Sequence, residues 1–157
     1  MAIYMQYDGG KIKGAGGQGN HQDWIVIKSI QWGVGRSVST DVGIKKEDGT
    51  REASEPSISE VVITKEFDKS SVLLSQESTT NNKGKDVKID FCSTANEGAP
   101  YLQIILSNCL ISGYSVTSGG DRPSESISLN FLKIEYNEAG TQAPNKSSYD
   151  LQKAKSS

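Results

Sequence analysis

The chain has 157 residues, of which 34% are hydrophobic and 23% charged, and its formal net charge is −2. This length and composition are typical of a single globular domain that buries a core without disulfides or metals. The weakly acidic charge implies no basic face and argues against nucleic-acid binding. No apolar run approaches the ~18 residues of a membrane span, so we expect no membrane insertion.

The N-terminal part contains a strand and then a glycine-rich segment. Residues 3–7 alternate between two faces, which predicts a strand. Residues 14–19 match the G-x-G-x-x-G pattern of dinucleotide-binding loops, which need a helix opening on the glycines. Residues 24–27 instead form a β pattern. Asp41 follows the glycines at about the sequence separation of the acidic residue that binds the ribose in dinucleotide sites, but it lies on a polar loop. We therefore favour a flexible loop and expect no cofactor, with an NAD-dependent oxidoreductase as the minor alternative.

Residues 23–34 predict a long β segment with a bend near Lys28. In its second half Ser29 and Gln31 point opposite to Ile30 and Trp32. The segment therefore has one polar and one apolar face.

Residues 37–56 are a polar stretch of mixed charge. A connection of this length is uncommon in a compact domain and is usually functional or disordered. We weigh equally an arm that reaches a neighbouring molecule and a mobile, solvated loop.

Residues 57–67 are rich in β-branched residues and predict a strand. Residues 68–71, Asp-Lys-Ser-Ser, offer side chains that accept from free backbone N–H groups, which is typical of a helix start. Val72, Leu73 and Leu74 follow, so we expect one short helix in an otherwise β chain.

Three further strands are predicted, at residues 86–93, 101–116 and 124–136, with a polar tail from about residue 137. We expect a mainly β fold, a two-sheet tight β-barrel or sandwich with one short α-helix on its side and a long extended arm loop. Cys92 and Cys109 lie within strands and are expected to be buried thiols.

No catalytic constellation emerges from the sequence. His21 is the only histidine, so neither a nucleophile–base pair nor a metal site has support, and we expect no enzyme and no metal. Asp90, Glu125 and Glu135 are most simply solvated carboxylates, and Arg122 could pair with Glu125 within a turn.

Several stretches together resemble the haemolysin-coregulated protein (Hcp) family, the tail-tube protein of bacterial type VI secretion systems. They are residues 58–65 followed by 68–71, residues 119–131, and residues 30–33 with His21 some ten residues earlier. The resemblance spans about residues 1–137, in order and at the family's spacing. Where many members have a glycine-rich arm, this chain has the charged residues 43–56.

The resemblance implies one Hcp-like domain over residues 1–157, without a fused toxin domain. It implies homohexameric rings that stack into a tube inside a contractile sheath, beneath a spike protein, and that carry effector proteins in the lumen. It also implies assembly in the cytoplasm and secretion without a cleaved signal peptide.

Two sets of residues are candidates for such assembly. Ser29 and Gln31 are candidates for the lumen face, with an outward solvent face as the alternative. Charged arm residues are candidates for ring stacking: Lys45, Lys46, Glu47, Asp48, Arg51, Glu52 and Glu55. The alternative function is a monomeric β-sandwich that binds carbohydrate or peptide, which would need an exposed aromatic platform.

Overall fold

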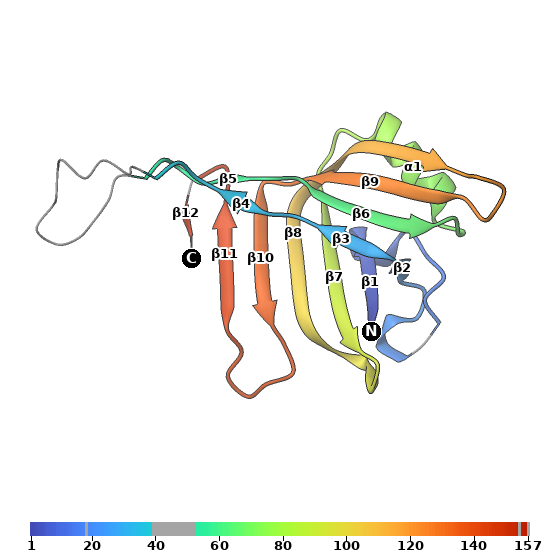
Figure 1. Ribbon diagram of the computed structural model, residues 1–157, viewed down its shortest axis with the longest axis horizontal. Helices are drawn as coiled ribbons and strands as arrows, with labels where there is room; N and C mark the ends of the chain where they lie inside the picture. The colour runs from blue at the N-terminus through green and yellow to red at the C-terminus, as the bar shows by residue number, and fades with distance from the viewer. Residues whose placement is uncertain (18, 39–52, 154, 157) are drawn as a thin grey trace, which may run out of the picture.

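The computed structural model describes residues 1–17, 19–38, 53–153 and 155–156, and its strands form two layers with one helix at an end (Figure 1). The larger group of strands is antiparallel in the order β12-β11-β10-β8-β7-β1-β2. Its members are β1 (Ala2–Tyr7), β2 (Ile25–Ile27), β7 (Lys85–Ser93), β8 (Asn96–Thr117), β10 (Lys133–Glu138), β11 (Lys146–Asp150) and β12 (Lys155–Ser156).

The smaller layer has four antiparallel strands in the order β3-β6-β9-β8. It contains β3 (Ser29–Gln31), β6 (Val61–Glu66), β9 (Ser124–Asn130) and the C-terminal half of β8. The long strand β8 is shared, because its residues up to Cys109 pair with β7 and β10, and those from Leu110 pair with β9. Asn108, at the junction, has a positive φ of 54°, which turns the strand between the layers.

At the opposite corner, Lys28 separates β2 from β3, and its N–H donates to the Thr64 carbonyl at 2.8 Å. The predicted bend lies here. A mainly β chain with one short helix is confirmed, whereas the closed barrel is not observed: the described strands form a large antiparallel sheet plus a small one. At Lys28 the chain changes partner, because β2 pairs with β1 whereas β3 pairs with β6.

The single α-helix among the described residues, α1 (Ser71–Thr80), begins where the Asp-Lys-Ser-Ser segment predicted it. Asp68 Oδ1 accepts from the Ser70 N–H at 2.8 Å, which satisfies a donor at the helix start. At the other side of the helix, the Tyr7 hydroxyl donates to Glu77 at 3.0 Å. Two 3₁₀ turns, η1 (Asp8–Gly10) and η2 (Gly19–His21), flank the glycine-rich segment. No described helix has the length and apolar character needed to cross a membrane.

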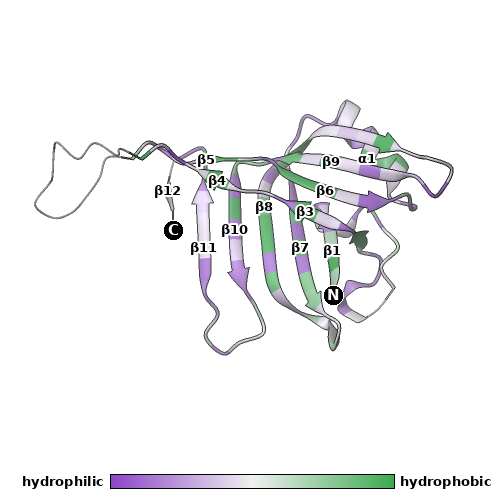
Figure 2. Cartoon of the chain, in the orientation of Figure 1, coloured by the Kyte–Doolittle hydropathy of each residue, from purple (hydrophilic) through white to green (hydrophobic). Residues whose placement is uncertain are grey.

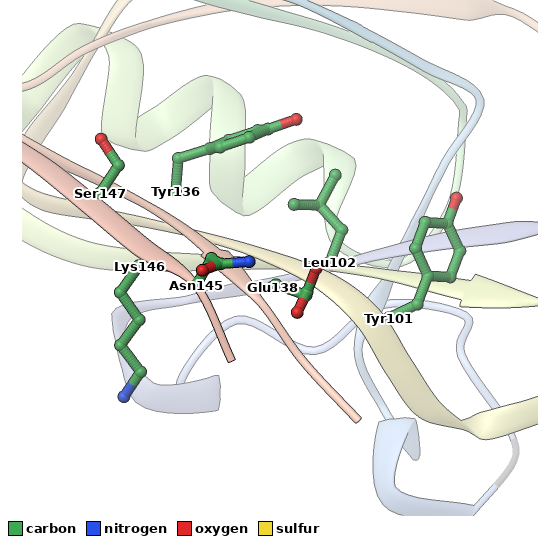
Figure 3. A pocket seen from close by; sticks show the side chains of 7 residues that line it. All are labelled: Tyr101, Leu102, Tyr136, Glu138, Asn145, Lys146 and Ser147. Atoms are coloured by element: carbon green, nitrogen blue, oxygen red, sulfur yellow. The ribbon is translucent and has the colours of Figure 1, made fainter. Parts of the chain in front are cut away.

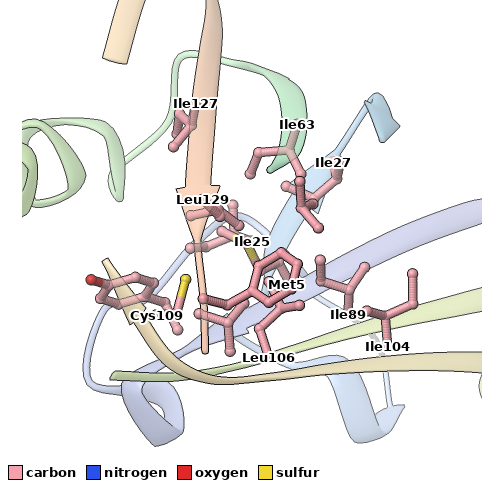
Figure 4. Packing of buried hydrophobic residues seen from close by; sticks show 14 of the residues in the cluster. Met5, Ile25, Ile27, Ile63, Ile89, Ile104, Leu106, Cys109, Ile127 and Leu129 are labelled. Atoms are coloured by element: carbon pink, nitrogen blue, oxygen red, sulfur yellow. The ribbon is translucent and has the colours of Figure 1, made fainter. Parts of the chain in front are cut away.

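The core lies between the two layers. Ile63, Ile127 and Leu129 of the small layer face Met5 and Leu106 of the large one (Figure 4). The hydropathy colouring agrees with this position of the core (Figure 2). Hydrophobic segments lie on β1, β6, β7, β8 and β9, whereas β11 is pale or hydrophilic. Both cysteines are buried and unlinked, as predicted.

The ends of the arm form a separate two-stranded ribbon, β4 (Val34–Gly35) with β5 (Ser57–Ile58). The Ser54 N–H donates to the Ser37 carbonyl at 2.8 Å, which extends the pairing outward. In Figure 1 the ribbon crosses β10 and β11 and leaves the body of the molecule on their side.

Candidate assembly surfaces

The outer face of the small layer carries a row of hydroxyl groups. Ser29 on β3 lies opposite Thr64, Thr64 opposite Ser126, and Ser126 opposite Ser115 on β8. The flanking rows add Ser124, Ser128 and Thr117. Because successive residues of a strand alternate between faces, the same register turns Ile63, Ile127 and Leu129 into the core. We call this surface the hydroxyl face.

Carboxylates lie at the two ends of the hydroxyl face: Glu60, which accepts from the Ser112 hydroxyl, and Glu66. Gln31 lies opposite Val62, and Ser128 continues the same row. Glu66, at one end, is paired with Lys28 at 2.7 Å, and this hydrogen bond lowers the pKa of the Glu66 carboxyl. Such a face offers hydroxyl groups for weak hydrogen bonds to another molecule, and its paired end charges do not attract a ligand strongly.

Both edges of the small layer are open among the described strands. On one side β3 pairs only with β6, and on the other the C-terminal half of β8 pairs only with β9. An open edge presents unpaired N–H and C=O groups that can pair with another chain. The hydroxyl face is therefore bounded by two edges suited to association.

The predicted lumen residues Ser29 and Gln31 both lie exposed on the hydroxyl face, and the Ser29 hydroxyl hydrogen-bonds that of Thr64. The sequence interpretation missed Thr64, Ser115 and Ser126. A signal was present, since Ser124, Ser126 and Ser128 alternate with buried residues along one strand.

The predicted arm residues are not brought together by the described structure. Lys45, Lys46, Glu47, Asp48, Arg51 and Glu52 lie outside the described residues. Glu55 is described and exposed, next to the paired base of the arm.

The glycine-rich segment is held by packing. The Gly16 N–H donates to the Trp24 carbonyl at 2.7 Å, and a side chain at Gly16 would lie 2.6 Å from the His21 carbonyl oxygen. His21 is buried, stacks on Tyr4 at 4.7 Å and donates from Nε2 to Asp90 at 2.8 Å. The glycines therefore permit close backbone approach to residues 21–25, which is a structural role.

A buried ionic cluster anchors the start of α1. Lys65 Nζ lies 2.5 Å from Glu125 Oε2 and 3.1 Å from Asp68 Oδ1. Ser71 donates to Glu125 at 2.8 Å, and Tyr114 donates to its other oxygen. Burial, then Glu125, raises the pKa of the Tyr114 phenol. The groups of this cluster pair with one another through hydrogen bonds and ion pairs, so we assign the cluster a role in stabilising the fold.

The described residues contain no group of three or more His, Cys, Asp or Glu side chains able to hold a metal ion. Both tryptophans are half-buried against other rings: Trp24 packs edge-on against His21, and Trp32 lies 5.5 Å from Tyr136. Neither provides the flat, exposed aromatic platform that the carbohydrate-binding alternative needs.

Known structures share this fold. A structure described as a type six secretion system protein has a TM-score of 0.84 and 20% identity, covering 99% of both chains. Hcp1 from Salmonella typhimurium has a TM-score of 0.77 and 18% identity, covering 99% of this chain and 98% of that one. The "secreted protein Hcp3" from Pseudomonas aeruginosa has 24% identity and a TM-score of 0.59, covering 94% and 98%. No curated protein sequence matches the chain.

The two-layer β fold with a single helix is thus that of solved type VI secretion proteins. Residues 4–137 match the sequence profile of the family described as "Type VI secretion system effector, Hcp". Because the match covers most of the chain, the chain belongs to the Hcp family and is a component of the type VI secretion tube. The family is structural and non-enzymatic, in agreement with the expectation from the sequence.

Proposed function

We propose that residues 1–157 act as one domain and that six copies close into a ring whose bore is lined by the hydroxyl face. The observation that carries this proposal is the combination of that face with two open edges on one four-stranded layer. If β3 of one copy meets the C-terminal half of β8 in the next, the interface is heterologous, and a heterologous interface closes into a ring when its rotation permits.

Stacking of rings needs a second interface along the bore axis. The arm is our candidate, because its paired base leaves the body beside β10 and β11 and the sequence beyond it is dense in both charge signs. Exposed ion pairs contribute about 0–1 kcal/mol each, so we expect weak, salt-sensitive stacking. Weak axial contacts suit a tube that must later come apart.

The proposed partners follow from the tube. They are further copies of the chain, a spike protein at the tip, a surrounding contractile sheath, and effector proteins carried in the bore. We propose assembly in the cytoplasm and export with the tube. The uncharged middle rows of the hydroxyl face, from Ser29 and Gln31 across to β9, support transport of varied cargo, since they offer no charge that would select one ligand.

The location of the bore can be tested by electron microscopy of the purified chain. A cysteine variant at Gln31, labelled with a small gold cluster, should place density inside the ring. The matched control is Lys88→Cys, on a strand of the large layer, which should place density outside the bore. Rings with the Gln31 label on their outer rim would reject the hydroxyl face as the bore lining.

A further inference from the structure

The four strands of the small layer alternate in direction. β3 pairs antiparallel with β6, β6 with β9, and β9 with the C-terminal half of β8. The two edge strands, β3 and β8, therefore run in opposite directions. A rotation about an axis that lies roughly along the strands keeps the direction of each strand, so β3 of one copy meets β8 of the next as an antiparallel pair. The two edges thus match in direction.

The β3 edge has one polar and one apolar side. Ser29 and Gln31 lie exposed on the hydroxyl face. Ile30, between them, lies opposite the buried Ile63 and packs against the core, yet it is only half-buried. Because β3 is the last described strand on this side of the small layer, Ile30 receives cover from one neighbouring strand only.

The β8 edge has the same two sides. Ser115 and Thr117 lie exposed on the hydroxyl face. Val116, between them, lies opposite the buried Glu125 and therefore points to the core side of the layer. Val116 is nevertheless 54% exposed, because the described chain has no further strand beyond this edge. An apolar side chain on the core side of an open edge marks a place where cover is missing.

The large layer also loses its cover at the β3 edge. Trp32, immediately after β3, packs on Tyr136 with ring centroids 5.5 Å apart. Along β10, Ile134 is buried, whereas Tyr136 is 43% exposed. Past this point lies a hollow of about 380 Å³, where Leu102 and Tyr136 point to the same side of the sheet (Figure 3). Its lining residues are Tyr101, Leu102, Tyr136, Glu138, Asn145, Lys146 and Ser147. The small layer therefore ends at β3, while the core face of the large layer continues past it.

We propose that β3 of one copy pairs antiparallel with the C-terminal half of β8 in the next, with Ile30 of the first copy opposite Val116 of the second on the core side. Two strands form one continuous sheet only when residues that point to the same face lie opposite one another. The pairing covers both apolar side chains and both open edges at once. The inference rests on the proposed ring and assigns the direction, the register and the side chains of its subunit contact.

This register continues the hydroxyl face from one copy to the next. Ser29 lies opposite Thr117 and Gln31 opposite Ser115, so polar side chains meet on the bore side. Within one copy Ser29 is level with Ser115, through the partners on β6 and β9. Neighbouring copies are therefore staggered by about two residues, and a closed ring of tilted strands needs such a stagger.

Disulfide cross-linking tests the register on the full chain. One variant combines Ser29→Cys with Thr117→Cys, and a second combines Ile30→Cys with Val116→Cys. Successive pairs in an antiparallel ladder alternate between wide and close spacing, so one of the two is the close pair that a disulfide needs. The control combines Ser29→Cys with Val116→Cys, whose thiols point to opposite faces of the proposed sheet. Native thiols contribute little background, because both are buried and burial raises the pKa of the Cys109 thiol to about 12.

The expected result is a ladder of covalent oligomers up to six chains for at least one same-face variant, and none for the control. In parallel, Val116→Lys should lose the rings with an unchanged unfolding temperature, because this side chain is exposed in the single chain. Val26→Lys, at a position 40% exposed on β2 of the large layer, should keep them. Rings that persist in Val116→Lys, with no more cross-linking in the same-face variants than in the control, would overturn the strand pairing while leaving the ring proposal standing. A wild-type chain that stays monomeric would overturn the ring itself.

Discussion

The ammonium of Lys65 lies 2.5 Å from the carboxylate of Glu125, and neither side chain has any exposed surface. The pair joins β6 to β9, and Lys65 also donates to the Ser71 hydroxyl at the first residue of α1, so it fixes the start of this helix. A buried pair of this kind is held by mutual neutralisation together with the hydrogen bonds around it.

Removal of this ammonium should be strongly destabilising. Lys65→Met leaves Glu125 and Asp68 as buried, uncompensated carboxylates, so we expect the free energy of unfolding to fall by about 3–5 kcal/mol. Denaturant unfolding measures the change. Lys28→Met, which removes the exposed partner of Glu66, is the matched control and should change stability far less. Equal losses of unfolding free energy in the two variants would show that the buried Lys65 cluster stabilises the fold no more than an exposed ion pair does.

Alkaline pH should lower the free energy of unfolding through ionisation of the Tyr114 phenol. Burial, then the Glu125 carboxylate, raises the pKa of this phenol in the folded state above its ordinary value of about 10. Below pH ~10 the phenol is protonated in both states and its contribution is complete. Above it the unfolded chain releases the proton first, so stability falls by about 1.4 kcal/mol per pH unit for this group until the folded-state pKa is passed.

The comparison of two variants isolates this group. Tyr114→Phe should flatten the decline of unfolding free energy above pH 10. Ser71→Ala removes another hydroxyl donor to Glu125 but no titrating proton, so it should lower stability and keep the wild-type slope. An unchanged slope in Tyr114→Phe would contradict the assignment.

The glycine-rich segment should tolerate a methyl group at one glycine and not at another. In Gly16→Ala the added carbon would lie 2.6 Å from the His21 carbonyl and 2.7 Å from that of Trp24. Both are backbone atoms, so we expect a loss of about 1–3 kcal/mol. Gly17→Ala is the control, since its nearest atom lies 4.0 Å away. Thermal unfolding compares the two, and NAD should shift the unfolding temperature of neither the variants nor the wild type.

Deletion of residues 45–55 should separate ring formation from stacking. We expect rings of normal size but no tubes, because the proposed ring interface lies on described strands outside that segment. A variant of the full arm length, with its charged residues replaced by serine, distinguishes charge from length. Electron microscopy at low and high salt reads out both, and normal filaments from the deletion would refute the role of the arm.

The sequence predicted the strands before residue 137, the helix start and the polarity of Ser29 and Gln31, because these depend on alternation and local capping. It missed β11 and β12, which lie in the predicted polar tail and pair with β10 and with each other. It placed Asp90 and Glu125 in solvent, which is wrong, since both are buried, whereas Glu135 is half-buried. His21, which follows the glycine-rich segment, hydrogen-bonds Asp90 from a distant part of the chain, and no local pattern encodes that contact. The burial of Glu125 could have been predicted, because alternation along its strand puts it on the same face as Ile127 and Leu129. The suggested pair of Arg122 with Glu125 is wrong, since Arg122 donates to the Phe67 carbonyl.

The pairing of β8 with both layers also lay beyond the sequence. It depends on long-range register, in which one residue of shift at the bulge between Ile111 and Gly113 changes which side chains face the core.

Native mass spectrometry of the purified full chain, over a range of concentrations, tests the central claim most directly. The account predicts one discrete oligomer of six times the chain mass, with no continuous series of other oligomers. A chain that remains monomeric at the highest concentration would contradict it.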